Sequence, residues 1–262
     1  MVKVKPARLL VEERRRRIMD LLEAQERVTV DELVLRFSVS AVTIRGDLDA
    51  LANAGAVVRS HGGALKRATP EDMPLTVKET LHHAEKVRIG HAACQMIRDG
   101  ETIMLDSGTT TAEIARQIKF LKFQSLNVIT NALNIAMELA THPNVRLIMI
   151  GGILRQMSYS LSGPHAEQTL RGLHADRLFL GVDGLDPEIG LMTPDMLEAQ
   201  LNAIMIQVSR EVVVVADSTK FHRRSLSVIA KLESVHKLIT DQGAMPELVA
   251  ALRARNVDVV LV

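Results

Sequence analysis

The sequence has little cysteine and few aromatic residues. Cys94 is its single cysteine, which excludes an intrachain disulfide framework and an ordinary cysteine-rich zinc site, so we expect no metal and no other cofactor. Phe, Tyr and Trp together make up 2% of the chain, which disfavours binding of single-stranded nucleic acid by base stacking. No apolar run approaches the roughly 18 residues of a transmembrane helix, and the basic N-terminus lacks the apolar stretch of a signal peptide. We therefore expect a cytoplasmic protein without a membrane partner.

The composition is that of a globular protein with a sizeable core. Of the 262 residues, 47% are apolar and 24% are charged, enough for one or two domains. The net charge of +1 hides an asymmetry: residues 1–67 carry 13 Lys and Arg against 9 Asp and Glu, whereas residues 68–262 carry 19 against 22. A basic excess in a small N-terminal module favours a nucleic-acid partner, and the scarcity of aromatic residues favours duplex DNA.

The N-terminal residues predict three helices and a β-hairpin. Apolar residues at helical spacing predict a first helix over 9–25. Residues 29–32 form a capping box that begins a second helix, and Ser40 is placed to cap a third, which Gly55 ends. A hairpin is expected over 56–67, because two short apolar and basic runs flank Ser-His-Gly-Gly.

This order of elements is typical of a winged helix-turn-helix domain, which we assign to residues 9–67. The third helix buries one stripe, so its opposite side is free to enter a major groove. Arg45 is long and forked enough to reach a guanine edge or a phosphate, and the hairpin tip would let backbone amides approach DNA. The residues expected to contact DNA are Ser40, Val42, Thr43, Arg45, Gly46, Arg59, His61 and Gly62.

Four successive arginines, Arg14 to Arg17, form the densest positive run. Successive helical residues point around the whole circumference, so at most two of the four can face one partner. We expect most of them to be solvated and one or two to contact phosphate.

The rest of the chain divides into a linker and an α/β domain. Residues 68–80 contain Pro70 and Pro74 and have no clear period, which predicts a linker. In residues 81–262 short apolar runs alternate with helical segments, which predicts a doubly wound parallel sheet. Thr193 and Pro194 are expected to begin one of its helices. Strands are expected at 102–105, 127–129, 147–150, 178–182, 212–216, 238–239 and 257–262, and helices near 83–98, 112–118, 133–140, 167–173, 196–210 and 247–255.

Polar residues follow these strands, where an open α/β sheet binds its ligands. The turn after the first strand combines hydroxyls with helix-start amides, a seat for phosphate, while Asp and Asn suit sugar hydroxyls and Lys220 would neutralise an anion. No GxGxxG follows the first strand, and GxxxxGK[ST] and GxSxG are absent, so a phosphorylated sugar fits better than a nucleotide. The candidate ligand residues are Asp106, Ser107, Gly108, Thr109, Thr110, Thr111, Asn131, Gly152, Asp183, Glu198 and Lys220.

These motifs, in this order, resemble those of the DeoR family of bacterial transcriptional regulators over nearly the whole chain. The resemblance rests on Gly55, Arg59 and residues 40–48, 61–64, 106–111, 129–131, 151–152, 181–184, 198–199 and 217–221. It is greatest to the regulators of amino-sugar and sugar-alcohol use. It implies a sensor domain similar in fold to ribose-5-phosphate isomerase and CoA-transferase-like proteins.

The resemblance also implies a function: repression of a carbohydrate operon by a homo-oligomer, a dimer or tetramer, that a phosphorylated sugar releases from operator DNA. By motif position, Asp106 to Thr111 would hold phosphate and Asp47 would brace the helix packing. Gly46 departs from the family, which often has a basic or amide residue there, and this departure bears on operator affinity or sequence preference, not on the identity of the domain.

An enzyme is the alternative. The same α/β fold allows a sugar-phosphate isomerase with Asp183 or Glu198 as the general base, and fold alone does not decide function. The N-terminal module discriminates between the two, because an isomerase has no use for it. We therefore expect a regulator and no enzymatic activity, with Cys94 in the core rather than acting as a nucleophile.

Overall fold

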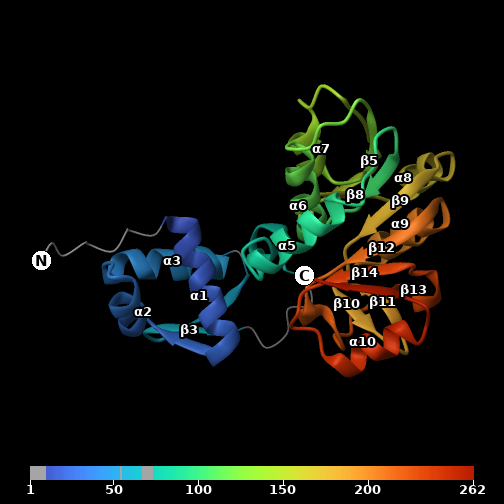
Figure 1. The fold of residues 1–262 in the computed structure, drawn as a ribbon. Coiled ribbons are helices and arrows are strands. Elements are labelled where there is room, and N and C mark those ends of the chain that lie inside the picture. The colour runs from blue at the N-terminus through green and yellow to red at the C-terminus, as the bar shows by residue number, and fades with distance from the viewer. Residues whose placement is uncertain (1–9, 54, 67–72) are drawn as a thin grey trace, which may run out of the picture. The chain divides into compact units, whose positions relative to one another are not determined.

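The computed structural model describes residues 10–53, 55–66 and 73–262. The chain forms two compact units, Met1–His82 and His83–Val262, which are described separately (Figure 1). Within the described residues no helix combines the length and the apolar character needed to cross a membrane.

The first unit has the three expected helices and the expected hairpin. It also has a three-residue strand, too short to show an alternating pattern in the sequence, which pairs with the hairpin in the sheet order β1-β3-β2. The elements are α1 Val11–Gln25, β1 Arg27–Thr29, α2 Val30–Phe37, α3 Ala41–Asn53, β2 Val57–Ser60 and β3 Gly63–Lys66.

The first unit has its own hydrophobic core, and part of the expected linker belongs to it. Ile18, Leu33 and Ile44 are fully buried there. Met73 and Val77 pack against the same cluster. The segment expected to be a linker thus contains the helix α4 Leu75–Lys78, because a proline directly before apolar residues begins a helix as readily as it marks a loop. Residues 67–72 lie outside the described part.

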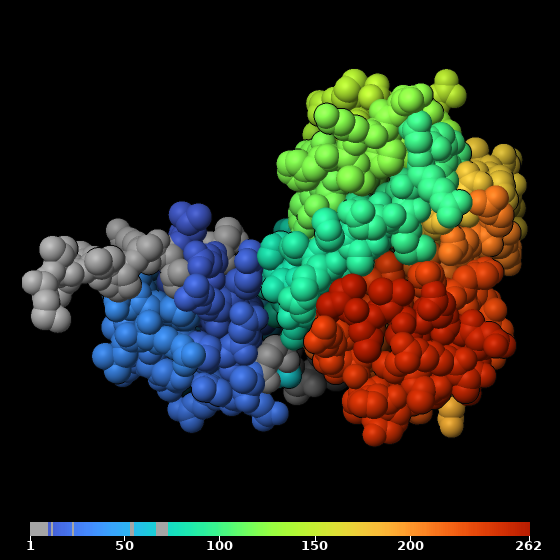
Figure 2. Space-filling view, viewed as in Figure 1, coloured from blue at the N-terminus to red at the C-terminus, as the bar shows by residue number. Residues whose placement is uncertain are grey.

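The second unit is built on a seven-stranded parallel sheet, as the alternating pattern predicts. Its strand order is β15-β14-β12-β9-β4-β5-β6. The strands are β4 Thr102–Leu105, β5 Leu126–Thr130, β6 Val145–Met149, β9 Ala175–Leu180, β12 Ser209–Val215, β14 Lys237–Thr240 and β15 Asp258–Leu261. In the space-filling view the teal residues that lead into β4 lie between the green stretch around α7 and the red C-terminal stretch (Figure 2).

Helices cover both faces of this sheet. Ile103 and Leu105 face one hydrophobic cluster and Met104 the other, as period two requires. The first cluster includes α5 His83–Cys94, α6 Thr109–Ile118 and α7 Leu133–Leu139; the second includes α8 Pro164–Arg171, α9 Met196–Gln207 and α10 Pro246–Arg253. Cys94 is buried, and burial raises the pKa of its thiol to about 12, consistent with the core role expected of it.

Two small antiparallel sheets were not predicted. One is the hairpin of β7 Ile153–Arg155 and β8 Ser160–Ser162, and the other joins β10 Gly184–Asp186, β11 Gly190–Thr193 and β13 Ser227–Ala230. Their strands are three or four residues long, too short for the alternation that reveals a strand in a sequence.

Two glycines of the first unit provide a matched stability test. A Cβ on Gly63 would lie 2.1 Å from the Val28 carbonyl oxygen, whereas one on Gly46 would meet nothing within 4 Å. We expect Gly63→Ala to lower the free energy of unfolding by about 1–3 kcal/mol and Gly46→Ala to raise it by up to about 1 kcal/mol. Urea unfolding of the full chain measures both, and equal effects would contradict the close approach of β1 to β3.

Candidate functional site

The outer side of α3 is open and polar. Val42 is 76% exposed, and Arg45 and Gly46 are also exposed. The Ser40 hydroxyl accepts the Thr43 amide at 3.1 Å, which confirms the expected cap, and the two hydroxyl oxygens lie 2.8 Å apart. This side of α3 thus offers a long cation, hydroxyls and a methyl-bearing side chain to a partner.

The inner side of α3 is fixed to α1 by a buried ion pair. Asp47 is 3% exposed; its Oδ2 lies 2.5 Å from Arg14 Nε, and its Oδ1 lies 3.1 Å from Arg15 Nε. The expectation that the arginine run is mostly solvated is therefore wrong for Arg14, which is 4% exposed. A buried carboxylate needs a cationic partner to offset its lost hydration, so the pair fixes the position of α3.

The wing is tied to the same helix. Arg59 donates from Nε to Asp49 Oδ1 at 2.8 Å and from its guanidinium to the Gly63 carbonyl at 2.5 Å. This side chain, expected to contact DNA, thus links the hairpin to α3. His61 and Gly62 remain exposed at the tip, whereas Gly63, expected beside Gly62 at the tip, is buried against β1.

In the second unit a polar site forms where the sheet reverses its order. The chain proceeds from β4 to β5 and β6 on one side, and returns to β9 on the other. Asp106 follows β4 and Gly181 follows β9, and the Gly181 amide donates to Asp106 Oδ1 at 3.1 Å. This is the switch point at which open α/β sheets bind ligands.

Burial raises the pKa of the Asp106 carboxyl from its ordinary value of 3.8 to about 7. Hydrogen bonds from the Gly181 amide and Thr111 oppose this rise, while the negative charges of Glu198 and Asp183 add to it. Asp106, Asp183 and Glu198 therefore share one electrostatic environment, although they lie far apart in the sequence.

In the turn into α6, the hydroxyl of Thr111, which was expected to bind a ligand, forms hydrogen bonds within the turn itself. Thr111 Oγ1 accepts the Gly108 amide at 2.8 Å and lies 3.0 Å from the Asp106 carbonyl. Its hydroxyl therefore shapes the turn. Ser107 and Gly108 are partly exposed, whereas Thr109 and Thr110 are buried in the first turn of the ten-residue helix.

Asn131 and Gly152 border the unpredicted β7–β8 hairpin. Asn131 is 1% exposed and donates from Nδ2 to the Leu161 carbonyl at 3.2 Å. Gly152 has a φ of 140°, and a Cβ there would lie 2.5 Å from the Ser162 carbonyl oxygen. Gly152 therefore permits close backbone packing, and nothing in its geometry indicates ligand contact.

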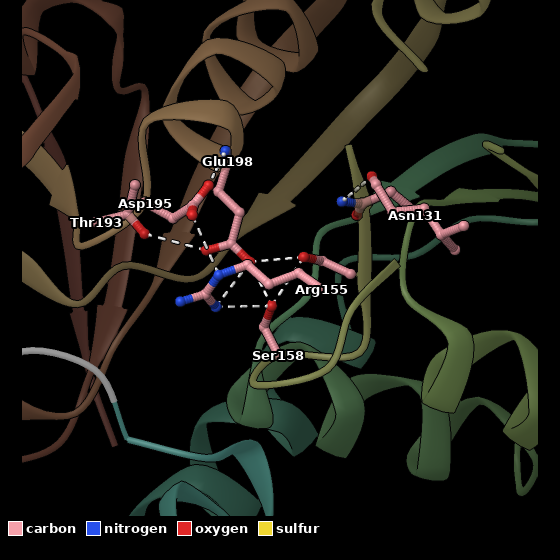
Figure 3. Close-up of polar contacts among 8 residues, drawn as sticks. Asn131, Arg155, Ser158, Thr193, Asp195 and Glu198 are labelled. Atoms are coloured by element: carbon pink, nitrogen blue, oxygen red, sulfur yellow. Dashed lines mark hydrogen bonds and ion pairs between the residues drawn. The ribbon is translucent and has the colours of Figure 1, made fainter. Parts of the chain in front are cut away.

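Glu198 is the centre of a network that sequence reasoning missed (Figure 3). Its Oε1 accepts from Ser160 Oγ at 2.6 Å and from Ser158 Oγ, and Arg155 lies 3.4 Å away. Arg155 also pairs with Asp195 at 3.2 Å. Only Glu198 was a candidate, because the sequence gives no sign that residues about 40 positions earlier fold back onto it.

The cap of α9 also differs from the expectation. Asp195 Oδ1 accepts the Glu198 amide at 2.9 Å, so Asp195, and not Thr193, begins the helix. The preference of helix N-termini for short polar acceptors allows either residue. Thr193 is the last residue of β11, so its backbone pairs in the small sheet and the helix begins after Asp195.

Lys220 and Asp183 lie at the same edge as Asp106. Lys220 Nζ is 3.8 Å from Asp183 Oδ1, and both side chains are mostly buried. Lys220 ends a short 3-10 helix that Asp217 caps through the Thr219 amide. The candidate residues after β4, β9 and β12 are thus brought together, with the Lys220 ammonium group beside the Asp183 carboxylate.

The raised pKa of Asp106 makes stability depend on pH. The unfolded chain releases the Asp106 proton near pH 4, whereas the folded protein holds it until about pH 7. Between these two pH values the folded state binds one more proton, so the free energy of unfolding should fall as the pH rises. The slope due to this group is at most about 1.4 kcal/mol per pH unit. Urea unfolding across the window should show a smaller fall for Asp106→Asn than for the unchanged protein. The Asp258 side chain is 61% exposed, so Asp258→Asn should show the same pH dependence as the unchanged protein. If Asp106→Asn also showed that same pH dependence, the raised pKa of Asp106 would be refuted.

Two family models match the chain, one in each unit. Residues 14–68 match the DeoR-like helix-turn-helix domain, and residues 81–242 match the DeoR C terminal sensor domain. Among solved structures, the chain is similar to the Pyrococcus horikoshii OT3 translation initiation factor eIF-2B (TM-score 0.43, 15% identity, 90% of each chain). It is also similar to ribose 5-phosphate isomerase A from Methanocaldococcus jannaschii (TM-score 0.38, 18% identity, 52% of this chain and 53% of the other).

Relatives match over most of the length. A candidate aga operon transcriptional repressor from Escherichia coli O157:H7 is 41% identical over 253 residues, 95% of this chain and 93% of the relative. The glycerol-3-phosphate regulon repressor of Escherichia coli K12 is 32% identical over 224 residues, 86% of this chain and 88% of the relative. With both domains matched in order, the chain belongs to the DeoR family of helix-turn-helix transcriptional regulators.

Proposed function

We propose that this protein represses a carbohydrate-utilisation operon, for amino sugars or sugar alcohols, and that a phosphorylated sugar releases it from operator DNA. The observation that carries the proposal is a buried polar site at the switch point of the sheet, on the same chain as an exposed helix suited to the major groove. The relatives named for the aga operon and the glycerol-3-phosphate regulon support the carbohydrate class.

The outer side of α3 supports DNA reading. Arg45 has the reach and fork to contact a guanine edge, and Ser40 and Thr43 supply hydroxyls at the N-terminal end of the helix, the end that enters the groove. Gly46 brings no side chain there, so Arg45 carries more of the contact. The inward ion pair between Asp47 and Arg14 keeps this side outward.

The site at the switch point supports a ligand with two chemically different ends. The N-terminus of α6 offers backbone amides to a phosphate. Asp183 and Glu198 would repel that phosphate and instead accept hydrogen bonds from hydroxyls. A sugar phosphate has both groups, and its phosphate would lie at the α6 turn with Lys220 as a further counter-charge.

The isomerase alternative has less support. A general base needs an acceptor within reach of a substrate proton, but Glu198 Oε1 already accepts from two serines and Arg155, and Asp183 lies beside Lys220. The relatives are transcriptional regulators. Turnover of ribose-5-phosphate at ordinary enzymatic rates by the purified protein would reverse this preference.

We propose that the effector acts by shifting populations. Sugar phosphate would close the sensor site, alter how the sensor domains of a dimer or tetramer associate, and displace the DNA-reading domains from their half-sites. A coupling free energy of about 1–3 kcal/mol is enough for a roughly 5–150-fold loss of DNA affinity.

Replacement of Arg45 tests the DNA interface. We expect Arg45→Ala to weaken operator binding by about 1–3 kcal/mol if its guanidinium reads a base. Fluorescence anisotropy with operator DNA at several salt concentrations measures this. Arg210→Ala removes an equal charge from an exposed side chain of the second unit and should change little; equal affinities of both variants would remove Arg45 from the interface.

Replacement of Lys220 tests the effector site. We expect Lys220→Ala to weaken binding of the releasing sugar phosphate about tenfold or more, as loss of a hydrogen bond to a charged group would, and to leave effector-free operator binding intact. Calorimetry measures the first quantity and anisotropy the second. Lys237→Ala, at the first residue of β14, is the control. Unaltered effector affinity in Lys220→Ala, or release by no sugar phosphate at all, would defeat the assignment.

A further inference from the structure

The β7–β8 hairpin is fastened to the sensor domain on two sides. Toward the end of β5, the Leu161 amide donates to the Asn131 carbonyl at 2.8 Å, and Asn131 Nδ2 donates to the Leu161 carbonyl at 3.2 Å. Toward the start of α9, the hairpin is held by the contacts of Ser158, Ser160 and Arg155 with Glu198. Figure 3 shows the second group around the Glu198 carboxylate, with Asn131 to one side.

The contact on the α9 side consists of hydroxyl groups on a carboxylate. Ser158 and Ser160 both reach Oε1 of Glu198, and their own oxygens lie 2.8 Å apart. Ser160 is fully buried and Ser158 is 8% exposed. The 2.8 Å between the two serine oxygens is close to the spacing of neighbouring hydroxyl oxygens in a vicinal diol.

The other side of the hairpin has an acceptor with nothing bound to it. In the part of the chain that the structure describes, Oδ1 of Asn131 is buried without a hydrogen-bond partner. An unsatisfied buried acceptor costs about 1–3 kcal/mol, so it calls for an explanation such as a missing ligand. A hydroxyl donor from a ligand would satisfy it.

We propose that a vicinal diol of the effector takes the place of the Ser158 and Ser160 hydroxyls on Glu198, and thereby releases residues 158–160 of the β7–β8 hairpin from α9, while Arg155 at the end of β7 keeps its contacts with Glu198 and Asp195. Arg155 stays on the carboxylate and orients it for the incoming diol. This inference rests on the proposed function and specifies its ligand as a sugar phosphate with two neighbouring hydroxyls.

The exchange is balanced in hydrogen bonds, which suits a switch. Each serine hydroxyl that leaves Glu198 is replaced by one sugar hydroxyl, so the Glu198 carboxylate keeps the same number of hydroxyl donors. Phosphate binding at the α6 turn and satisfaction of Asn131 Oδ1 then decide the population of the state in which the two serines have left Glu198. The serines act as internal competitors of the ligand, and Arg155 acts as a positioning residue.

The experiment uses changes with opposite expected signs. Calorimetry on the full-length protein compares ribose-5-phosphate, glucosamine-6-phosphate, galactosamine-6-phosphate and glycerol-3-phosphate, all of which carry a vicinal diol, with inorganic phosphate. For the tightest-binding sugar or glycerol phosphate, we expect the double variant Ser158→Ala, Ser160→Ala to bind about fivefold or more tightly, since about one hydrogen bond's worth of competition is lost. We expect Arg155→Met to bind about tenfold or more weakly. Inorganic phosphate should bind the unchanged protein and both variants equally. A general loss of structure would instead weaken the binding of sugar phosphate and inorganic phosphate alike.

Two controls keep the test decisive. Arg155→Lys retains the charge and should recover part of the affinity even if Arg155→Met folds poorly, and Arg210→Met should leave every affinity unchanged.

The outcomes separate the two claims. If the unchanged protein binds none of the diol-bearing phosphates, the proposed function fails and this inference fails with it. If it binds one, but the serine variant binds it equally or more weakly, the proposed function stands and the exchange at Glu198 is overturned. Equal binding by Arg155→Met would remove Arg155 from the mechanism.

Discussion

Two strands that are distant in the chain, β4 and β9, are neighbours in the parallel sheet, and the chain runs outward from them in opposite directions. This reversal leaves the carboxyl ends of both strands without a crossover helix between them, so a polar site can form there. The hydrogen bond from the Gly181 amide to Asp106 links these two ends. The other features of this polar site depend on this adjacency, because it brings Asp183, Glu198 and Lys220 to the residues that follow β4.

Burial of charge explains the rest of the site. A carboxylate removed from water must be paired or hydrogen-bonded, or else protonated. All three solutions occur in this site: Glu198 is bound by hydroxyls and Arg155, Asp183 is near Lys220, and the pKa of the Asp106 carboxyl rises to about 7. A ligand rich in hydroxyls can exchange with such internal partners, whereas an apolar ligand cannot.

In the first unit, one side of α3 is fixed to the rest of the domain and the opposite side is exposed. Asp47 points inward to Arg14, and Arg45, two residues earlier, is exposed. Arg59 fixes the wing to the same helix through Asp49. Because the helix is held by ion pairs on one side and by apolar residues such as Ile44, its outer side keeps a defined position with few contacts of its own.

The sequence by itself determined the elements whose signals are local. Ser40 caps α3 because its acceptor lies three residues from the Thr43 amide, and the alternation of apolar runs and helices determined the parallel sheet. Only the tertiary structure decided which polar groups are used internally. It buried Arg14 against Asp47, 33 residues away, turned the Thr111 hydroxyl back into its own turn, and brought Ser158 to Glu198 across 40 residues. The physical reason is range: a cap or a period is specified within a few residues, whereas the partner of a buried charge depends on which distant strands become neighbours.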